Sequence, residues 1–137
     1  MTDYDLDIFA RTLYGEARGE YAYAGPAALI AVANVIMNRF KRGKKYGKTI
    51  TEVCLKPRQF SCWNKSDSNR TLIQQEEITH TPLFILCEKI VQKVSRDIWP
   101  DLTRDSDHYH ATSCQPYWAK PEKIKLRLGH HIFYKLD

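Results

Sequence analysis

Hydrophobic residues recur at helical spacing near the start of the chain. Between residues 3 and 18 they occur every three or four positions, at Leu6, Phe9, Ala10, Leu13 and Ala17. Glu16 lies on or beside this apolar face, three positions after Leu13 and seven after Phe9. We therefore expect a helix that ends near Gly19, with an opposite, solvated face that carries Arg11, Tyr14 and Arg18.

A carboxylate on an apolar helix face suggests a catalytic general acid. Burial disfavours the charged form of a carboxyl group, and enzymes use this effect to keep a general acid protonated near neutral pH. Alternatively, Glu16 lies at a frayed helix end beside Gly15 and faces water.

A second helix is predicted from Pro26 to about Lys41, because proline follows Gly25 at a first helical position. The segment is apolar nearly all round, which is typical of a central helix packed on several sides. Asn34 and Asn38, one turn apart, interrupt it. Buried amides need hydrogen-bond partners, so these two either brace neighbouring loops or line a cleft.

The remaining pattern predicts two more helices, then strands. Thr49 with Glu52 forms a capping-box pattern before a short helix that Pro57 ends, and Thr81-Pro82 begins a helix that stops before Trp99. Extended segments follow at 108–110, 124–128 and 131–136, the last two around a tight turn at Gly129-His130. The fold class is therefore α+β, mostly helical with a small C-terminal antiparallel sheet.

Composition fits one domain over residues 1–137 and gives a net charge of +5. A cluster in one loop could supply all of this charge: Lys41, Arg42, Lys44, Lys45 and Lys48. It would favour nucleic acid, phospholipid headgroups or an anionic cell-wall polymer, or it is simply a solvated loop.

No apolar run is long enough to span a bilayer, and the start MTDYDLDIF lacks the features of a secretory signal, so we expect synthesis in the cytoplasm.

The cysteines suggest little chemistry. Cys87 falls on an apolar helix face, whereas Cys54 and Cys62 flank a short loop and could pair in an oxidising compartment. A metal site would have to combine these two with His108, His110 and Cys114, whose spacings match no zinc template. We expect no metal and no cofactor.

Several stretches resemble the SleB/CwlJ-type cell-wall hydrolases, which are spore-cortex-lytic enzymes with phage and proteobacterial relatives. The similarity covers nearly the whole chain in order, in ARTLYGEARGE (10–20), AVANVIMNR (31–39), QFSCW (59–63), HYHA (108–111), YWA (117–119) and GHHIFY (129–134).

The resemblance implies a lysozyme-like domain that acts on the glycan strands of peptidoglycan, with Glu16 as the catalytic acid. The spore enzymes are similar to lytic transglycosylases, in which one carboxyl group protonates the glycosidic oxygen after N-acetylmuramic acid and the 6-hydroxyl of that sugar closes on C1. A hydrolytic muramidase would need a second carboxylate, and none of Glu20, Asp67, Asp105 and Asp107 has a motif-level claim to that role.

The resemblance also bears on the other motif residues. Gln59, Ser61, Tyr109 and Tyr134 would orient the acetamido group or the acid, and Trp63, Tyr117 and Trp118 would offer faces to sugar rings, although each is equally compatible with a structural role. For His130 and His131 we expect structural roles.

We expect a monomer without a separate wall-binding module. It would act at the cell wall or periplasm after release, either as a phage or prophage lysin or through a dedicated secretion route. We expect the basic loop to bind the anionic wall, and we expect no nucleic acid partner. Two alternatives remain: a Cys/His amidase or peptidase that uses Cys62 or Cys114 with His108, and a non-enzymatic basic polymer-binding module.

Overall fold

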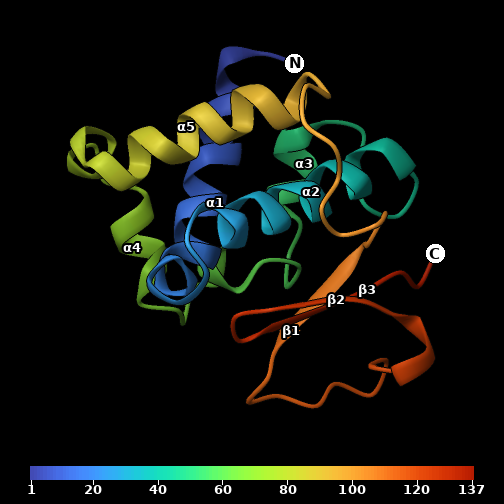
Figure 1. Ribbon diagram of the computed structural model, residues 1–137. Coiled ribbons are helices and arrows are strands. Elements are labelled where there is room, and N and C mark those ends of the chain that lie inside the picture. The colour runs from blue at the N-terminus through green and yellow to red at the C-terminus, as the bar shows by residue number, and fades with distance from the viewer.

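The helices precede the sheet along the chain in the computed structural model, which describes residues 1–137 (Figure 1). The five α-helices are α1 (Asp3–Ala24), α2 (Pro26–Arg42), α3 (Ile50–Leu55), α4 (Asn69–Ile73) and α5 (Pro82–Ser95). Short 3-10 helices are η1 (Ser61–Trp63), η2 (Glu77–His80) and η3 (Pro121–Lys123), and the strands are β1 (His108–Ala111), β2 (Ile124–Leu128) and β3 (His131–Tyr134). The predicted α+β class is confirmed.

Local signals set the helix ends. The Thr2 hydroxyl accepts the Asp5 N–H at 3.0 Å while the Asp5 carboxylate accepts the Thr2 N–H at 3.0 Å, and the Thr81 hydroxyl accepts the Phe84 N–H at 3.2 Å. Helix α1 continues to Ala24, past the expected end at Gly19, because the chain turns only at Gly25. There φ is +64°, a conformation that favours glycine.

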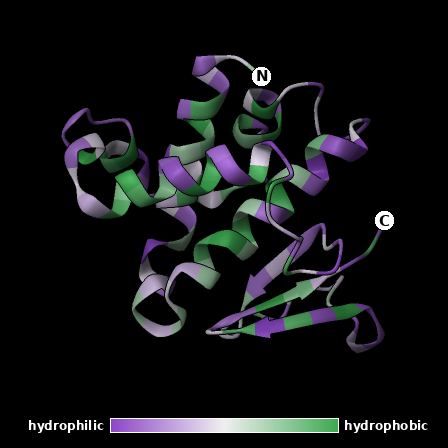
Figure 2. Cartoon of the chain, turned by 45° about the horizontal axis from the view of Figure 1, so that its top comes forward, coloured by the Kyte–Doolittle hydropathy of each residue, from purple (hydrophilic) through white to green (hydrophobic).

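Helices α1, α2 and α5 pack around the core, and Figure 2 shows hydrophobic green bands alternating with hydrophilic purple ones along the helices. The central position of α2 is confirmed, since most of its residues from Ala28 to Arg39 are buried. The expected solvated face of α1 is wrong. Arg11 and Tyr14 are buried. The Arg11 guanidinium donates to the Ile73 and Gln75 carbonyls, each at 2.9 Å, and the Tyr14 ring packs on Phe84 of α5 with centroids 5.8 Å apart.

The sheet is antiparallel, with β3 between β1 and β2 and with Tyr109 opposite Phe133. Phe133 is fully buried and joins the sheet to the helical core. Strand β3 ends at Tyr134, earlier than expected. The Asp107 carboxylate accepts the N–H groups of Leu136 and Asp137 at 2.9 and 2.8 Å, which draws the chain out of the ladder.

Both asparagines of α2 brace the loop that leads into β1. The Asn34 side-chain oxygen accepts the Leu102 N–H at 3.1 Å, and the Asn38 amide donates to the Asp101 carboxylate at 2.8 Å and to the Ser106 carbonyl at 2.9 Å. The bracing interpretation is confirmed. None of the helices combines the length and hydrophobicity needed to cross a bilayer.

Candidate active site

Glu16 lies where α1, η1 and β1 meet, and its half-buried side chain accepts hydrogen bonds from two of these elements. One oxygen, Oε2, accepts the Cys62 N–H at 3.0 Å and the Ser61 hydroxyl at 3.5 Å, both from η1. The other oxygen, Oε1, accepts the Tyr109 hydroxyl from β1 in a short hydrogen bond. Segments 45 and 93 positions away in sequence therefore fix one carboxylate.

Gly15 allows η1 to approach α1 this closely. A Cβ at this position would lie 2.8 Å from the Cys62 Cβ and 3.1 Å from the Ile73 Cγ2. Any larger residue would push η1 away from the helix, and the Cys62 N–H would move off Glu16. The glycine before the acid is thus needed for the shape of the site.

Tyr109 is a neutral donor to Glu16. Burial raises the pKa of its phenol well above the ordinary value, and the adjacent Glu16 carboxylate raises it further. The hydroxyl therefore keeps its proton near neutral pH. The ring also packs on the buried His131, with centroids 5.0 Å apart, and burial lowers the pKa of that imidazole despite the nearby Glu20 and Glu16.

Neither cysteine of the amidase alternative is arranged as a nucleophile. Burial raises the pKa of the Cys62 thiol far above its ordinary value, and the neighbouring Glu16 carboxylate adds to this effect. Cys114 is exposed, and its hydrogen-bonding neighbour is Ser113. His108, the histidine of this alternative, pairs with Asp107 at 2.8 Å and forms no hydrogen bond with either thiol.

Arg39, in the last turn of α2, is a site residue that sequence reasoning missed. Its buried guanidinium donates to the Asp107 carbonyl at 2.7 Å and to the Gln59 side chain at 3.2 Å, and it stacks over the Phe60 ring at 5.0 Å. Burial lowers its pKa, while neighbouring Tyr109 and the carboxylates of Asp107 and Glu16 act in the opposite direction. The available signals were an arginine on an otherwise apolar helix and its place at the end of the motif AVANVIMNR (31–39).

The predicted substrate-binding residues near η1 have different contacts. Ser61 contacts Glu16 directly, whereas the exposed Gln59 is linked to the site through Arg39. Trp63 is half-buried, and its indole N–H donates to the Thr12 hydroxyl at 2.9 Å, one turn before Glu16. Its indole therefore anchors η1 to α1.

Two predicted residues form an aromatic cluster on the sheet. The Tyr134 hydroxyl bonds His110 Nε2 at 2.8 Å, and since His110 Nδ1 faces the Ala111 carbonyl at 2.7 Å, Nδ1 carries the proton and Nε2 accepts. Trp118 packs against the Tyr134 ring at a centroid distance of 5.3 Å. Neither residue touches Glu16, and Tyr117 is 97% exposed.

The other acidic residues considered as a second carboxylate each form a hydrogen bond or an ion pair elsewhere in the structure. Asp67 accepts the Asn69 N–H at 2.8 Å and Asp105 pairs with Arg42 at 3.1 Å. Glu20 and the fully buried Asp107 also accept hydrogen bonds, from His130 and from residues 136 and 137 respectively. No three His, Cys, Asp or Glu side chains cluster closely enough to hold a metal ion.

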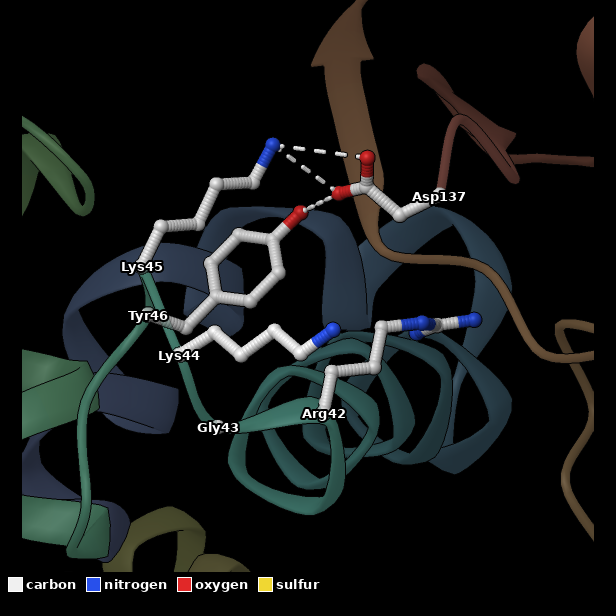
Figure 3. Close-up of a pocket in the computed structure, with 6 residues that line it drawn as sticks. All are labelled: Arg42, Gly43, Lys44, Lys45, Tyr46 and Asp137. Carbon is white, nitrogen blue, oxygen red and sulfur yellow. Dashed lines mark hydrogen bonds and ion pairs between the residues drawn. The ribbon is translucent and has the colours of Figure 1, made fainter.

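Three of the five cations in the basic cluster have carboxylate partners. Lys41 pairs with Asp97, Arg42 with Asp105 and Lys45 with Asp137, so only Lys44 and Lys48 lack an anionic partner. Figure 3 shows the Lys45 ammonium and the Tyr46 hydroxyl on the Asp137 carboxylate, at a pocket of about 500 Å³ that residues 42–46 and 137 line. This pocket contains no residue that contacts Glu16.

Two solved structures and one family model resemble this chain, while no curated protein sequence matches it. The catalytic domain of the germination-specific lytic transglycosylase SleB from Bacillus anthracis is 25% identical in sequence, with a TM-score of 0.73. The alignment covers 98% of this chain and 97% of that domain. The catalytic domain of the Bacillus cereus SleB protein is 25% identical, covers 98% and 91%, and has a TM-score of 0.72.

The family model, described as cell wall hydrolase, matches residues 25–134. This match begins after Glu16 and therefore does not include that residue. The match nevertheless spans most of the chain, and the two structures align over nearly all of it. The chain therefore belongs to the cell wall hydrolase family, as a peptidoglycan-degrading enzyme of the SleB/CwlJ type.

Proposed function

We propose that this enzyme cleaves glycan strands between N-acetylmuramic acid and N-acetylglucosamine as a lytic transglycosylase, with Glu16 as general acid and base. The observation that carries the proposal is one carboxylate held by donors from η1 and β1 at the junction of helices and sheet. The similarity to a lytic transglycosylase domain over nearly the whole of both chains supports it.

The two oxygens of Glu16 have different roles. The Cys62 N–H can only donate, so Oε2 acts as the acceptor, and the transferable proton resides on Oε1. The Tyr109 hydroxyl accepts from the protonated carboxyl group and donates to the carboxylate, so it serves both states of the acid.

The reaction then needs one carboxyl group. Glu16 protonates the glycosidic oxygen as the bond from that oxygen to C1 breaks, and its carboxylate removes the proton of the 6-hydroxyl as O6 bonds to C1. The product carries a 1,6-anhydro end, and Glu16 is again protonated. A hydrolytic muramidase would need a second carboxylate, and none of Glu20, Asp67, Asp105 and Asp107 shares a hydrogen-bond partner with Glu16.

Substrate contacts follow from exposure. Gln59 and Ser61 are exposed beside the acid and would hydrogen-bond an acetamido group, and the exposed ring of Tyr117 would contact a sugar face. Trp63, through its bond to Thr12, would support the site from the helices, and Trp118 and Tyr134, which pack on each other, would support it from the sheet.

The unpaired Lys44 and Lys48 would concentrate the enzyme on the anionic cell wall. The neighbouring cations Lys41, Arg42 and Lys45 contribute less, because each already has a carboxylate partner.

The test is the effect of Glu16→Gln on purified peptidoglycan, with Glu88→Gln as a matched control on an exposed residue of α5. Glutamine keeps the shape and removes the transferable proton, so we expect a folded protein with nearly all activity lost. Mass spectrometry of the soluble products should find anhydro ends. Reducing ends would identify a muramidase, free peptides an amidase, and a fully active Glu16→Gln enzyme would overturn the assignment.

A further inference from the structure

The sheet is attached to the helices by polar contacts on either side of Glu16. On one side, Asn38 and Arg39 of α2 bind the carbonyls of Ser106 and Asp107, directly before β1. On the other side, Glu20 of α1 binds the turn between β2 and β3. In Figure 1 the sheet lies beside the helices, and the contacts between the two parts join segments far apart in the sequence.

The contact made by Glu20 is closely fitted. Its side chain is only 12% exposed, and its two oxygens bond the His130 N–H at 2.8 Å and His130 Nδ1 at 3.1 Å. Gly129, the residue before His130, has a φ of +57°. A Cβ at Gly129 would overlap Glu20 Oε2. The turn therefore accommodates Glu20 because residue 129 has no side chain. The Tyr23 ring meets the His130 ring edge-on, with centroids 4.4 Å apart.

A short path of contacts leads from Glu20 to the acid. Glu20 is one turn after Glu16, about 6 Å along the helix axis. Glu20 fixes the backbone of His130, the next residue His131 packs its ring on Tyr109, and Tyr109 bonds Glu16. Two carboxylates on one face of α1 thus hold the same sheet.

We propose that Glu20 is a positioning residue for the Glu16–Tyr109 pair, which acts by holding the β2–β3 turn so that the Tyr109 hydroxyl stays on the acid. The inference rests on the proposed role of Glu16. It differs from a purely stabilising role, because loss of the Glu20 contact should move Tyr109 in a protein that remains folded.

The first measurement compares Glu20→Ala with Glu88→Ala, the same change at an exposed glutamate of α5. A displacement of about 1 Å at a reacting group costs up to about 100-fold in rate, so we expect Glu20→Ala to lower kcat by about 10- to 100-fold with KM little changed. In NMR spectra of ring-labelled tyrosine, the signal that Tyr109→Phe removes should shift in Glu20→Ala and not in Glu88→Ala.

Two conservative variants separate geometry from charge. Glu20→Gln keeps an oxygen at full reach of the His130 N–H and should restore most of kcat, whereas Glu20→Asp keeps the charge, falls short of the turn and should behave like Glu20→Ala. The reverse order would show that charge matters rather than position. These variants also decide the question if Glu20→Ala does not fold.

Gly129→Ala adds a test of coupling. In the wild-type background the new methyl group overlaps Glu20 and should lower kcat strongly, but beside Glu20→Ala the overlap is gone and the further loss should be much smaller. Wild-type kcat in Glu20→Ala, or an unshifted Tyr109 signal, would overturn the proposal. The NMR measurement requires no activity, so this outcome is distinct from an active Glu16→Gln enzyme, which would refute the role of Glu16.

Discussion

Replacement of Asn38 by leucine tests how the helices hold the entrance to β1. Asn38 is 7% exposed, and its amide donates to the Ser106 carbonyl at 2.9 Å and to the Asp101 carboxylate at 2.8 Å. Leucine has a similar volume, so packing alone predicts a loss below about 1.5 kcal/mol or even a gain in stability. The hydrogen bonds predict a clear loss.

The magnitude follows from the burial of the two partners. Ser106 is fully buried, and an unsatisfied carbonyl there costs about 1–3 kcal/mol. Asp101 is exposed and keeps its bonds from Thr103 and Asp105, so its oxygen can rehydrate and adds little. We expect Asn38→Leu to lower the free energy of unfolding by about 2 kcal/mol, which at this chain length lowers Tm by about 6–8 °C.

Asn34→Leu is the matched comparison one turn earlier. Asn34 accepts a single bond, from the Leu102 N–H at 3.1 Å, and Leu102 is 39% exposed, so water can replace the lost partner. We expect a loss of at most about 1 kcal/mol.

Thermal unfolding followed by circular dichroism, together with activity at 25 °C, separates the two variants. Ser106 is three residues before Tyr109, so we expect the activity of Asn38→Leu to fall further than the folded fraction requires. If both variants melt at or above the wild-type temperature with full activity, the asparagines do not hold this loop and the reasoning is refuted.

Three further predictions concern the acid, the basic loop and acid stability. Tyr109→Phe removes one hydrogen-bond donor to Glu16 and should lower kcat by about 10- to 100-fold with Tm nearly unchanged. Steady-state kinetics and melting curves test this, and an unchanged kcat would show that the hydroxyl has no part in the mechanism. Replacing Lys44 and Lys48 by alanine should reduce activity on intact walls at low salt much more than activity on short soluble glycans. The reason is that exposed charges act over about 10 Å and concentrate the enzyme on a polyanion. Equal losses on both substrates would contradict this electrostatic role. Burial raises the pKa of Asp107, but bonds from a neighbouring imidazole and two backbone N–H groups lower it to about 2, below the ordinary 3.8. The resulting stability, about 2 kcal/mol, is present above pH 4 and is lost as pH falls towards 2, so urea melts of Asp107→Asn should show a weaker acid dependence than the wild type.

Much of the secondary structure could be predicted because its signals are local. The start of α5 depends on Thr81 and Pro82, and that of α3 on the Thr49 hydroxyl, which accepts the Glu52 N–H at 3.0 Å. Each signal acts within about one helical turn, so neighbouring letters contain it. Gly19 misled the prediction of the α1 end, because a glycine inside a helix costs only about 1 kcal/mol and packing outweighs that cost.

The acid could be predicted as a candidate, but its partners could not. Periodicity placed Glu16 beside the apolar face of α1, and the similarity to SleB/CwlJ-type enzymes gave it a role. The sequence could not show that Tyr109 and Cys62 bind it, nor that Arg39 joins Gln59 to the entrance of β1. Among seven residues expected at the substrate, only Ser61 and Tyr109 touch the acid.

By itself the sequence determined the order of helices and strands, the apolar character of α2 and the family. Only the tertiary structure decided that Arg11 and Tyr14 are buried, that three of the five clustered cations are paired, and that Glu20 holds the turn at Gly129. The reason is the range of the interactions. Helix caps and periodicity depend on residues within a few positions, whereas burial, ion pairing and the shape of the site depend on which distant segments pack together.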